Sequence, residues 1–293
     1  MIAASGDGHL IRMIVNADDF GYFDGVSQGI IEAAECGVVT ATGVMANGPA
    51  LPQWIERLTT LSHLSTGVHL NATLGRPLTA EMAERMAFNG GCFPPKGALV
   101  SSLLMRRLPV QTLMHEWRAQ ILYCLRGGLQ LDFINSHEHI HALPALYPRV
   151  RALADEFGIR HVRAPRPEWG PAITLAGCIR SAALATARLA GPGTVGTEPD
   201  LVGVNPSGHM SATYCRWLFP RLMPGKAYEL MCHPGRPDAL ARADSSLNAY
   251  HDWEGELTLL MSPDFADMLR TNRIVLASYA DLNEAPSSDS LQQ

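Results

Sequence analysis

Short apolar segments alternate with segments of helical spacing along most of the chain, and this alternation restricts the fold more than any other feature. Residues 12–17 contain Met13, Ile14 and Val15 in a row, which is typical of a fully buried strand in a parallel sheet. Helical spacing follows over 25–36, and 38–45 is again apolar and β-branched. A strand, a helix and a second strand over this length form a βαβ unit, whose crossover makes the two strands parallel.

The same alternation continues towards the end of the chain. Further strands are expected over 65–70, 131–136, 159–163, 227–232 and 274–279. Further helices are expected over 52–61, 110–125, 146–157, 211–222 and 263–270. Repeated β-α units over this length predict one α/β domain, either barrel-like or doubly wound.

Two stretches interrupt the alternation. Residues 77–96 are rich in turn residues, and Phe-Asn-Gly-Gly at 88–91 suits a hairpin or an excursion over the site. Residues 165–207 are rich in Pro and Gly, with an Ala-rich helix expected at 179–189, and we interpret them as an insertion near the mouth of the site. The domain is predicted to span 12–284, with flexible tails at 1–11 and 285–293.

Composition excludes several classes of partner. The net charge is -5 and Lys and Arg do not cluster, which argues against nucleic acid. No apolar run reaches the roughly 18 residues that a membrane-spanning helix needs. The first ten residues do not resemble a secretory leader, and none of the six cysteines forms a Cys-x-x-Cys pair. We therefore expect a cytoplasmic protein with reduced thiols.

Two adjacent carboxylates, Asp18 and Asp19, directly follow the first apolar strand, in Asn-Ala-Asp-Asp-Phe-Gly at 16–21. Adjacent residues that leave a strand point in different directions, so one carboxylate can bind a metal while the other faces a water molecule or a substrate. An Asp-rich turn that caps the following helix is the alternative.

Single histidines stand at the ends of two other apolar strands. His69 lies in Gly-Val-His-Leu-Asn at 67–71, and His233 lies in Cys-His-Pro-Gly at 232–235. Each position suits a metal or substrate site. The alternatives are a hydrogen-bonded core histidine for His69 and an ordinary strand-to-turn residue for His233.

Three histidines at alternate positions, His137, His139 and His141, follow the strand expected over 131–136. If that strand continues, their side chains share one face, and convergent imidazoles favour a metal. A solvated His-rich loop is the alternative.

These four strand ends are more informative together than singly. In a parallel sheet, the carboxyl ends of neighbouring strands meet at one rim. Asp19, His69 and one histidine of the 137–141 cluster would there supply three ligands and leave a position open for water, as in a catalytic metal site. We therefore predict a metal-dependent hydrolase with its site at the C-terminal rim of the strands.

The four motifs resemble those of the YdjC-like carbohydrate deacetylases, which include chitooligosaccharide deacetylases and hopanoid-associated glycolipid deacetylases. Their order and spacing match, and the resemblance runs from about residue 13 to 282. It implies a single-domain, distorted (β/α) TIM-like barrel that removes an N-acetyl group from an amino sugar. The chain departs from the family pattern at Arg236, where an aromatic residue is expected after His-Pro-Gly.

The resemblance also implies roles for individual residues. Asp19, His69 and His137 would bind one divalent metal ion. Asp18 would be the general base that activates water, and His233 would be the general acid that protonates the leaving amine.

Three further residues are expected to bind the substrate. His139 and His141 would orient ligands or contact sugar hydroxyls. Arg163 follows a predicted strand and would contact the substrate, with a surface ion pair as its alternative role.

Several metals and more than one reaction class are compatible with these residues. One carboxylate and two imidazoles favour Zn²⁺, while Mg²⁺, Mn²⁺, Co²⁺ and Ni²⁺ fit the same ligands. A metal-dependent phosphoesterase is a second interpretation, and a second metal about 3.5–4 Å from the first would favour it. A non-catalytic carbohydrate- or metal-binding protein is a third, against which Asp18 and His233 argue. A homodimer agrees with the base rate for oligomers.

Overall fold

The first strand forms the centre of the sheet. β1 (Ile11–Phe20) is buried along almost its whole length, as its unbroken apolar start requires. One edge of β1 pairs with β7 (Ala227–Cys232). Its other pairings are divided between β8 (Ile274–Leu276), which contacts the start of β1, and β2 (Ala41–Val44), which contacts its end.

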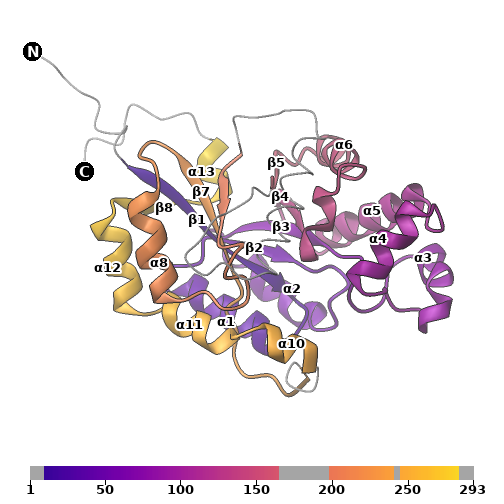
Figure 1. Cartoon of the computed structure of the whole chain (residues 1–293), viewed down its shortest axis with the longest axis horizontal. Helices are drawn as coiled ribbons and strands as arrows, with labels where there is room; N and C mark the ends of the chain where they lie inside the picture. Colours follow the sequence, from indigo (N-terminus) through magenta and orange to yellow (C-terminus); the bar gives the residue numbers. More distant parts are fainter. Residues whose placement is uncertain (1–9, 165–197, 241–244, 284–293) are drawn as a thin grey trace, which may run out of the picture.

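All pairings in this sheet are parallel. The strand order is β5-β4-β3-β2-β1-β7-β6, with β8 beside β1 (Figure 1). The remaining strands are β3 (Ser65–Leu70), β4 (Leu131–Ser136), β5 (His161–Val162) and β6 (Asp200–Val202). The carboxyl ends of β1, β3, β4 and β7 therefore lie along one rim, as the sequence predicts.

Helices surround the sheet (Figure 1). They are α1 (Asp24–Glu35), α2 (Leu51–Thr59), α3 (Ala80–Arg85), α4 (Lys96–Leu104), α5 (Val110–Arg126), α6 (Tyr147–Phe157), α8 (Ala212–Leu218), α10 (Ser245–Tyr250), α11 (Trp253–Leu260), α12 (Pro263–Thr271) and α13 (Tyr279–Asn283). Short 3₁₀ turns are η2 (Ala87–Asn89), η3 (His137–Ala142) and η4 (Phe219–Arg221). None of the helices in the described ranges combines the length and apolarity needed to cross a bilayer.

The sheet curls so that its two ends approach each other. Glu198, just before β6, accepts a hydrogen bond from the backbone N–H of Val162 at 3.2 Å and pairs with His161 Nδ1 at 2.9 Å, both on β5. Inside the curl, the rings of Phe133 and Tyr279 stack at 4.3 Å and fill the interior. This parallel, curled sheet confirms the predicted distorted TIM-like barrel.

The computed structural model describes residues 10–164, 198–240 and 245–283. The helix predicted at 179–189, most of the predicted insertion and nearly all of both predicted tails lie outside these residues. Within 77–96 the chain forms α3, η2 and the start of α4, so the predicted turn-rich stretch is partly helical, and 88–91 forms no hairpin. β6 lies within the stretch interpreted as an insertion, and α10 and α11 were not predicted.

Candidate active site

The end of β1 delivers both adjacent carboxylates to one cavity. Strict strand alternation would place Asp18 and Asp19 on opposite faces. The register of β1 with β2 shifts between Ala17 and Phe20, and Asp19 has a φ of 70°, in the left-handed region. This irregularity turns Asp19 so that it lines the same cavity as Asp18.

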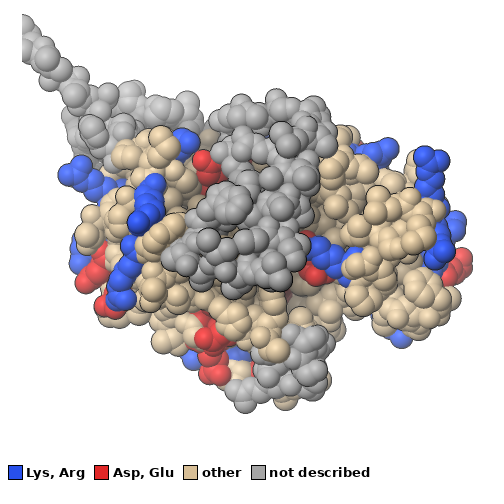
Figure 2. Space-filling view, in the orientation of Figure 1, with Lys and Arg blue, Asp and Glu red and all other residues tan. Residues whose placement is uncertain are grey.

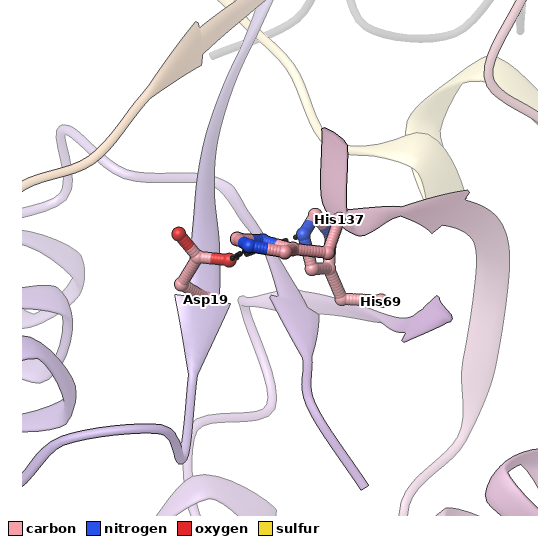
Figure 3. Close-up of side chains that lie close together, drawn as sticks. All are labelled: Asp19, His69 and His137. Atoms are coloured by element: carbon pink, nitrogen blue, oxygen red, sulfur yellow. Dashed lines mark hydrogen bonds and ion pairs between the residues drawn. The ribbon is translucent and has the colours of Figure 1, made fainter. Parts of the chain in front are cut away.

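Asp19, His69 and His137 converge from β1, β3 and the turn after β4 (Figure 3). Asp19 Oδ1 lies 3.1 Å from His69 Nε2 and 3.0 Å from His137 Nδ1. One ligand atom from each residue lies within 4.8 Å of the other two. A carboxylate and two imidazoles at this spacing fit a divalent transition metal with open positions.

His69 is oriented by a partner behind it. Its Nδ1 lies 2.7 Å from Asn135 Oδ1, and an amide oxygen can only accept, so Nδ1 carries the proton. The other ring nitrogen, Nε2, then faces Asp19 and the cavity. A hydrogen bond of this kind on the far nitrogen is the usual support of a metal-binding histidine.

The charges of the cluster also favour a cation. Burial alone would raise the pKa of Asp19, but His137 and His69 outweigh it and hold the pKa well below its ordinary value. Burial would lower the pKa of His137, but the neighbouring Asp19 carboxylate raises it above its ordinary value. Asp19 is therefore an anion, and the positive charge that balances it in this structure comes from the neighbouring imidazoles.

A buried arginine, Arg163, holds Asp18 in place. Arg163 donates from Nη1 to Asp18 Oδ2 at 2.7 Å and from Nη2 to Asp18 Oδ1 at 2.9 Å, and it also donates to Glu229 on β7. Burial would raise the pKa of Asp18, but the Arg163 guanidinium outweighs it, so the pKa lies below its ordinary value. Asp18 also accepts from Asn16 and Asn135, which fixes its orientation.

This position of Arg163 corrects its predicted role. Its side chain is 0% exposed and it does not line the cavity, so it neither contacts a substrate there nor forms a surface ion pair. Arg163 instead positions Asp18. Glu229, a charged residue inside the otherwise apolar strand β7, was the sequence signal of this buried network.

The three histidines after β4 do not share one face, which corrects a further prediction. The strand ends at Ser136, and η3 follows with Glu138 and His139 at φ values of 53° and 57°. These left-handed residues turn His137 towards Asp19 and bring His139 to the cavity wall. His141 turns away and is fully buried, bonded to Ser136 Oγ and to the carbonyl oxygen of Arg163, so it does not reach a substrate.

His233 follows β7 and faces the same cavity. Its backbone N–H donates to Glu256 Oε2 at 2.6 Å, which fixes the turn. Its ring lies 4.9 Å from that of His251, a cavity residue that sequence analysis did not find because no motif surrounds it. Arg236, the departure from the family pattern, is outside the cavity and pairs with Glu32 on α1.

The cavity has a volume of about 480 Å³, a size that suits a small ligand. Asp18, Asp19, His69, His137, His139 and His233 all line it. Figure 2 shows basic and acidic side chains interspersed over the described part of one molecular face, rather than a basic patch. The geometry thus places an anion, three possible metal ligands and a histidine around one space.

Comparison with known proteins identifies the family. A family model described as YdjC-like protein matches residues 12–271. A protein from Geobacillus stearothermophilus named carbohydrate deacetylase is 32% identical over 271 residues, covering 92% of this chain and 96% of that protein. A protein of the same name from Vibrio vulnificus (strain CMCP6) is 31% identical over 283 residues, covering 94% and 98%.

A solved structure shares the fold. It is a protein from Enterococcus faecalis V583, described as a candidate cellobiose-phosphate cleavage protein, with a TM-score of 0.72 and 26% identity. The match covers 93% of this chain and 99% of that one. With the family model matching most of its length and relatives above 30% identity along nearly all of it, the chain belongs to the YdjC-like protein family.

Proposed function

We propose that the protein is a metal-dependent carbohydrate deacetylase that hydrolyses the N-acetyl group of an amino sugar to a free amine and acetate. The observation that carries this proposal is the convergence of Asp19, His69 and His137 at one end of a cavity that Asp18 and His233 also line. The names of the relatives from Geobacillus and Vibrio support the carbohydrate and the acetyl group.

Asp19, His69 and His137 would hold one divalent cation, with Zn²⁺ favoured by the ligand set and Mg²⁺, Mn²⁺, Co²⁺ or Ni²⁺ compatible with it. Such an ion supplies Lewis-acid polarisation of the amide carbonyl and acidifies the attacking water. The support in this chain is the orientation of His69, whose Nδ1 bonds to Asn135 so that Nε2 faces the site.

The residues of the chain then handle the protons. Asp18, kept anionic and oriented by Arg163, takes the proton from the attacking water. His233 donates a proton to the departing nitrogen, because an amine leaves poorly without one. General acid and base steps of this kind typically contribute about 10²- to 10⁴-fold each.

A phosphoesterase is the second candidate, because the solved relative is described in terms of cellobiose-phosphate cleavage. Within the described ranges, one group of three possible metal ligands is present, whereas phosphoesterases often use two metals about 3.5–4 Å apart. The ligand set therefore favours amide hydrolysis.

The test is a substrate panel assayed for both products. The Zn²⁺-loaded protein is incubated with N-acetylglucosamine, its β-1,4 oligosaccharides, an N-acetylglucosamine glycolipid and cellobiose phosphate, and released acetate and phosphate are measured. We expect acetate release from an N-acetylated sugar that Asp18→Asn reduces by at least about 100-fold while the metal content stays the same. Phosphate release without acetate release would overturn the proposal in favour of the second candidate.

A further inference from the structure

Buried polar atoms that lack a hydrogen-bond partner gather at the cavity. Within the described ranges, these atoms include Thr73 Oγ1, His139 Nδ1, His233 Nδ1 and His251 Nδ1, and all four residues line the cavity. Unpaired buried polar atoms are uncommon because each costs stability. Their concentration at one cavity points to a hydroxyl- or amide-bearing ligand that completes their hydrogen bonds. His233 and His139 already have expected roles, whereas Thr73 and His251 have none.

His251 is fixed in place before any ligand arrives. The residue is only 8% exposed, and its ring stacks on that of Trp253 at 4.9 Å with 16° between the planes. The ring of Tyr250 packs edge-on against it at 4.7 Å. Next to it, the backbone N–H of Asp252 donates to the carbonyl oxygen of Gly208 at 2.7 Å, which anchors the segment. A preset imidazole of this kind loses little entropy when it binds a ligand.

The position of His251 indicates which part of a substrate it contacts. Its ring lies 4.9 Å from the ring of His233, the proposed proton donor to the departing nitrogen. A group beside His233 therefore lies close to the sugar carbons next to that nitrogen. Burial, with a contribution from nearby His233, lowers the pKa of His251 to about 3, so its ring is neutral at physiological pH. A neutral imidazole offers one donor and one acceptor, which suits a sugar hydroxyl.

Thr73 is presented by a rigid loop after β3. The backbone N–H groups of Thr73 and Leu74 both donate to Asn71 Oδ1, at 3.0 and 3.1 Å. Asn71 in turn donates to the carbonyl oxygen of Leu74. Leu74 and His251 also line one small cleft at the edge of the cavity, so this loop and the His251 segment border the same space.

We propose that His251 and Thr73 are substrate-binding residues that hydrogen-bond the hydroxyl groups of the sugar ring next to the acetamido group. This inference rests on the proposed deacetylase function and makes it more specific. It restricts the substrates to hydroxyl-bearing sugar rings, because simple N-acetylated amines would leave both residues unpaired.

The test measures binding without turnover. In the Asp18→Asn background, the Kd for the N-acetylglucosamine disaccharide is determined by calorimetry for the parent, His251→Phe and Thr73→Val. Phe keeps the stack on Trp253 and Val keeps the shape of Thr, so only hydrogen-bonding atoms are removed. We expect each change to raise the Kd about 2- to 15-fold, as for loss of a neutral hydrogen bond. His115→Phe, at an exposed histidine outside the cavity, should leave the Kd unchanged.

Two further readouts separate the possible failures. Melting temperatures within a few degrees of the parent show that the variants fold. A disaccharide that lacks the 3-hydroxyl group should bind the parent more weakly than the full disaccharide does. His251→Phe should bind the two disaccharides equally well. An unchanged Kd in both variants, or no binding by the parent, would overturn the inference. The other outcome is that the two substitutions weaken binding but the Zn²⁺-loaded wild type releases no acetate. That result would overturn the deacetylase function, while the sugar contacts of His251 and Thr73 would be retained.

Discussion

The guanidinium group of Arg163 donates hydrogen bonds to both carboxylate oxygens of Asp18, at 2.7 and 2.9 Å, in a buried ion pair. The same guanidinium donates to Glu229 at 2.6 Å, so one cation is shared by two carboxylates. A planar, two-point contact fixes direction as well as charge. Asp18 is therefore presented to the cavity in one orientation, as its proposed role as general base requires.

Removal of this cation should be costly. We predict that Arg163→Met lowers the free energy of unfolding by about 3–5 kcal/mol, because Asp18 and Glu229 are left buried without a counterion. Urea unfolding of the metal-free protein measures the effect. Arg216→Met is the matched control, since its partner Asp264 is exposed and such pairs contribute about 0–1 kcal/mol. Equal losses in the two variants would show that the buried network adds no stability of its own.

The strands were predictable because their pattern is local. The apolar runs at 65–70, 131–136 and 227–232 became β3, β4 and β7 with the same boundaries. Parallel pairing places the ends of these strands at one rim, which is why Asp19, His69 and the histidine cluster at 137–141 could be grouped from the sequence, while the choice of His137 came from the family resemblance. β6 has only three residues and pairs with β7, so no local pattern in the sequence marks it. α11 was missed although Asp252 caps its first turn.

The details of the site were not predictable for a related reason. Strand alternation holds only while the backbone stays extended, and His139 and Asp19 both adopt positive φ values. The burial of Arg163 depends on two carboxylates from β1 and β7, more than sixty residues away on either side. A single sequence records neither the left-handed turn nor this long-range pairing.

His141 makes the stability of the protein depend on pH. Burial lowers its pKa to about 3, below the ordinary value of 6.5, and its ring already bonds Ser136 and the carbonyl oxygen of Arg163. Between these pH values the unfolded chain binds a proton that the folded chain does not. Stability should therefore fall as the pH drops from about 6.5 towards 3, by up to about 1.4 kcal/mol per pH unit from this group.

The measurement is urea unfolding at several values between about pH 4 and 8, for the wild type and His141→Gln. The variant should be less stable at the upper end of this range, where the buried hydrogen bonds are lost, and should show a shallower decline at the acidic end. Parallel curves for the two proteins would show that His141 contributes nothing to the acid sensitivity.

A glycine on β2 leaves room for the site. A Cβ atom at Gly43 would lie 3.0 Å from His69 Nδ1 and 3.1 Å from Asn135 Oδ1, closer than side-chain atoms normally approach. We predict that Gly43→Ala displaces His69 by a few tenths of an ångström and lowers acetate release on the order of tenfold. The metal affinity, measured by competition with a chelating dye, should fall as well.

Gly97→Ala is the control for this substitution. Nothing lies within 4 Å of a Cβ at Gly97, which is part of α4, so Ala there should leave acetate release unchanged and add up to about 1 kcal/mol of stability. If Gly43→Ala and Gly97→Ala had the same activity and metal affinity, the close packing beneath His69 would be irrelevant to the site.

In the proposed function, Asp19, His69 and His137 hold a metal ion on which hydrolysis depends. The most direct test is to measure bound metal by mass spectrometry and acetate release together, in the wild type and in Asp19→Asn, before and after dialysis against a chelator. We predict about one metal ion per wild-type chain and acetate release that disappears with the metal and returns when Zn²⁺ is restored. Asp19→Asn should show neither bound metal nor acetate release. Undiminished acetate release from fully metal-free protein would contradict this prediction.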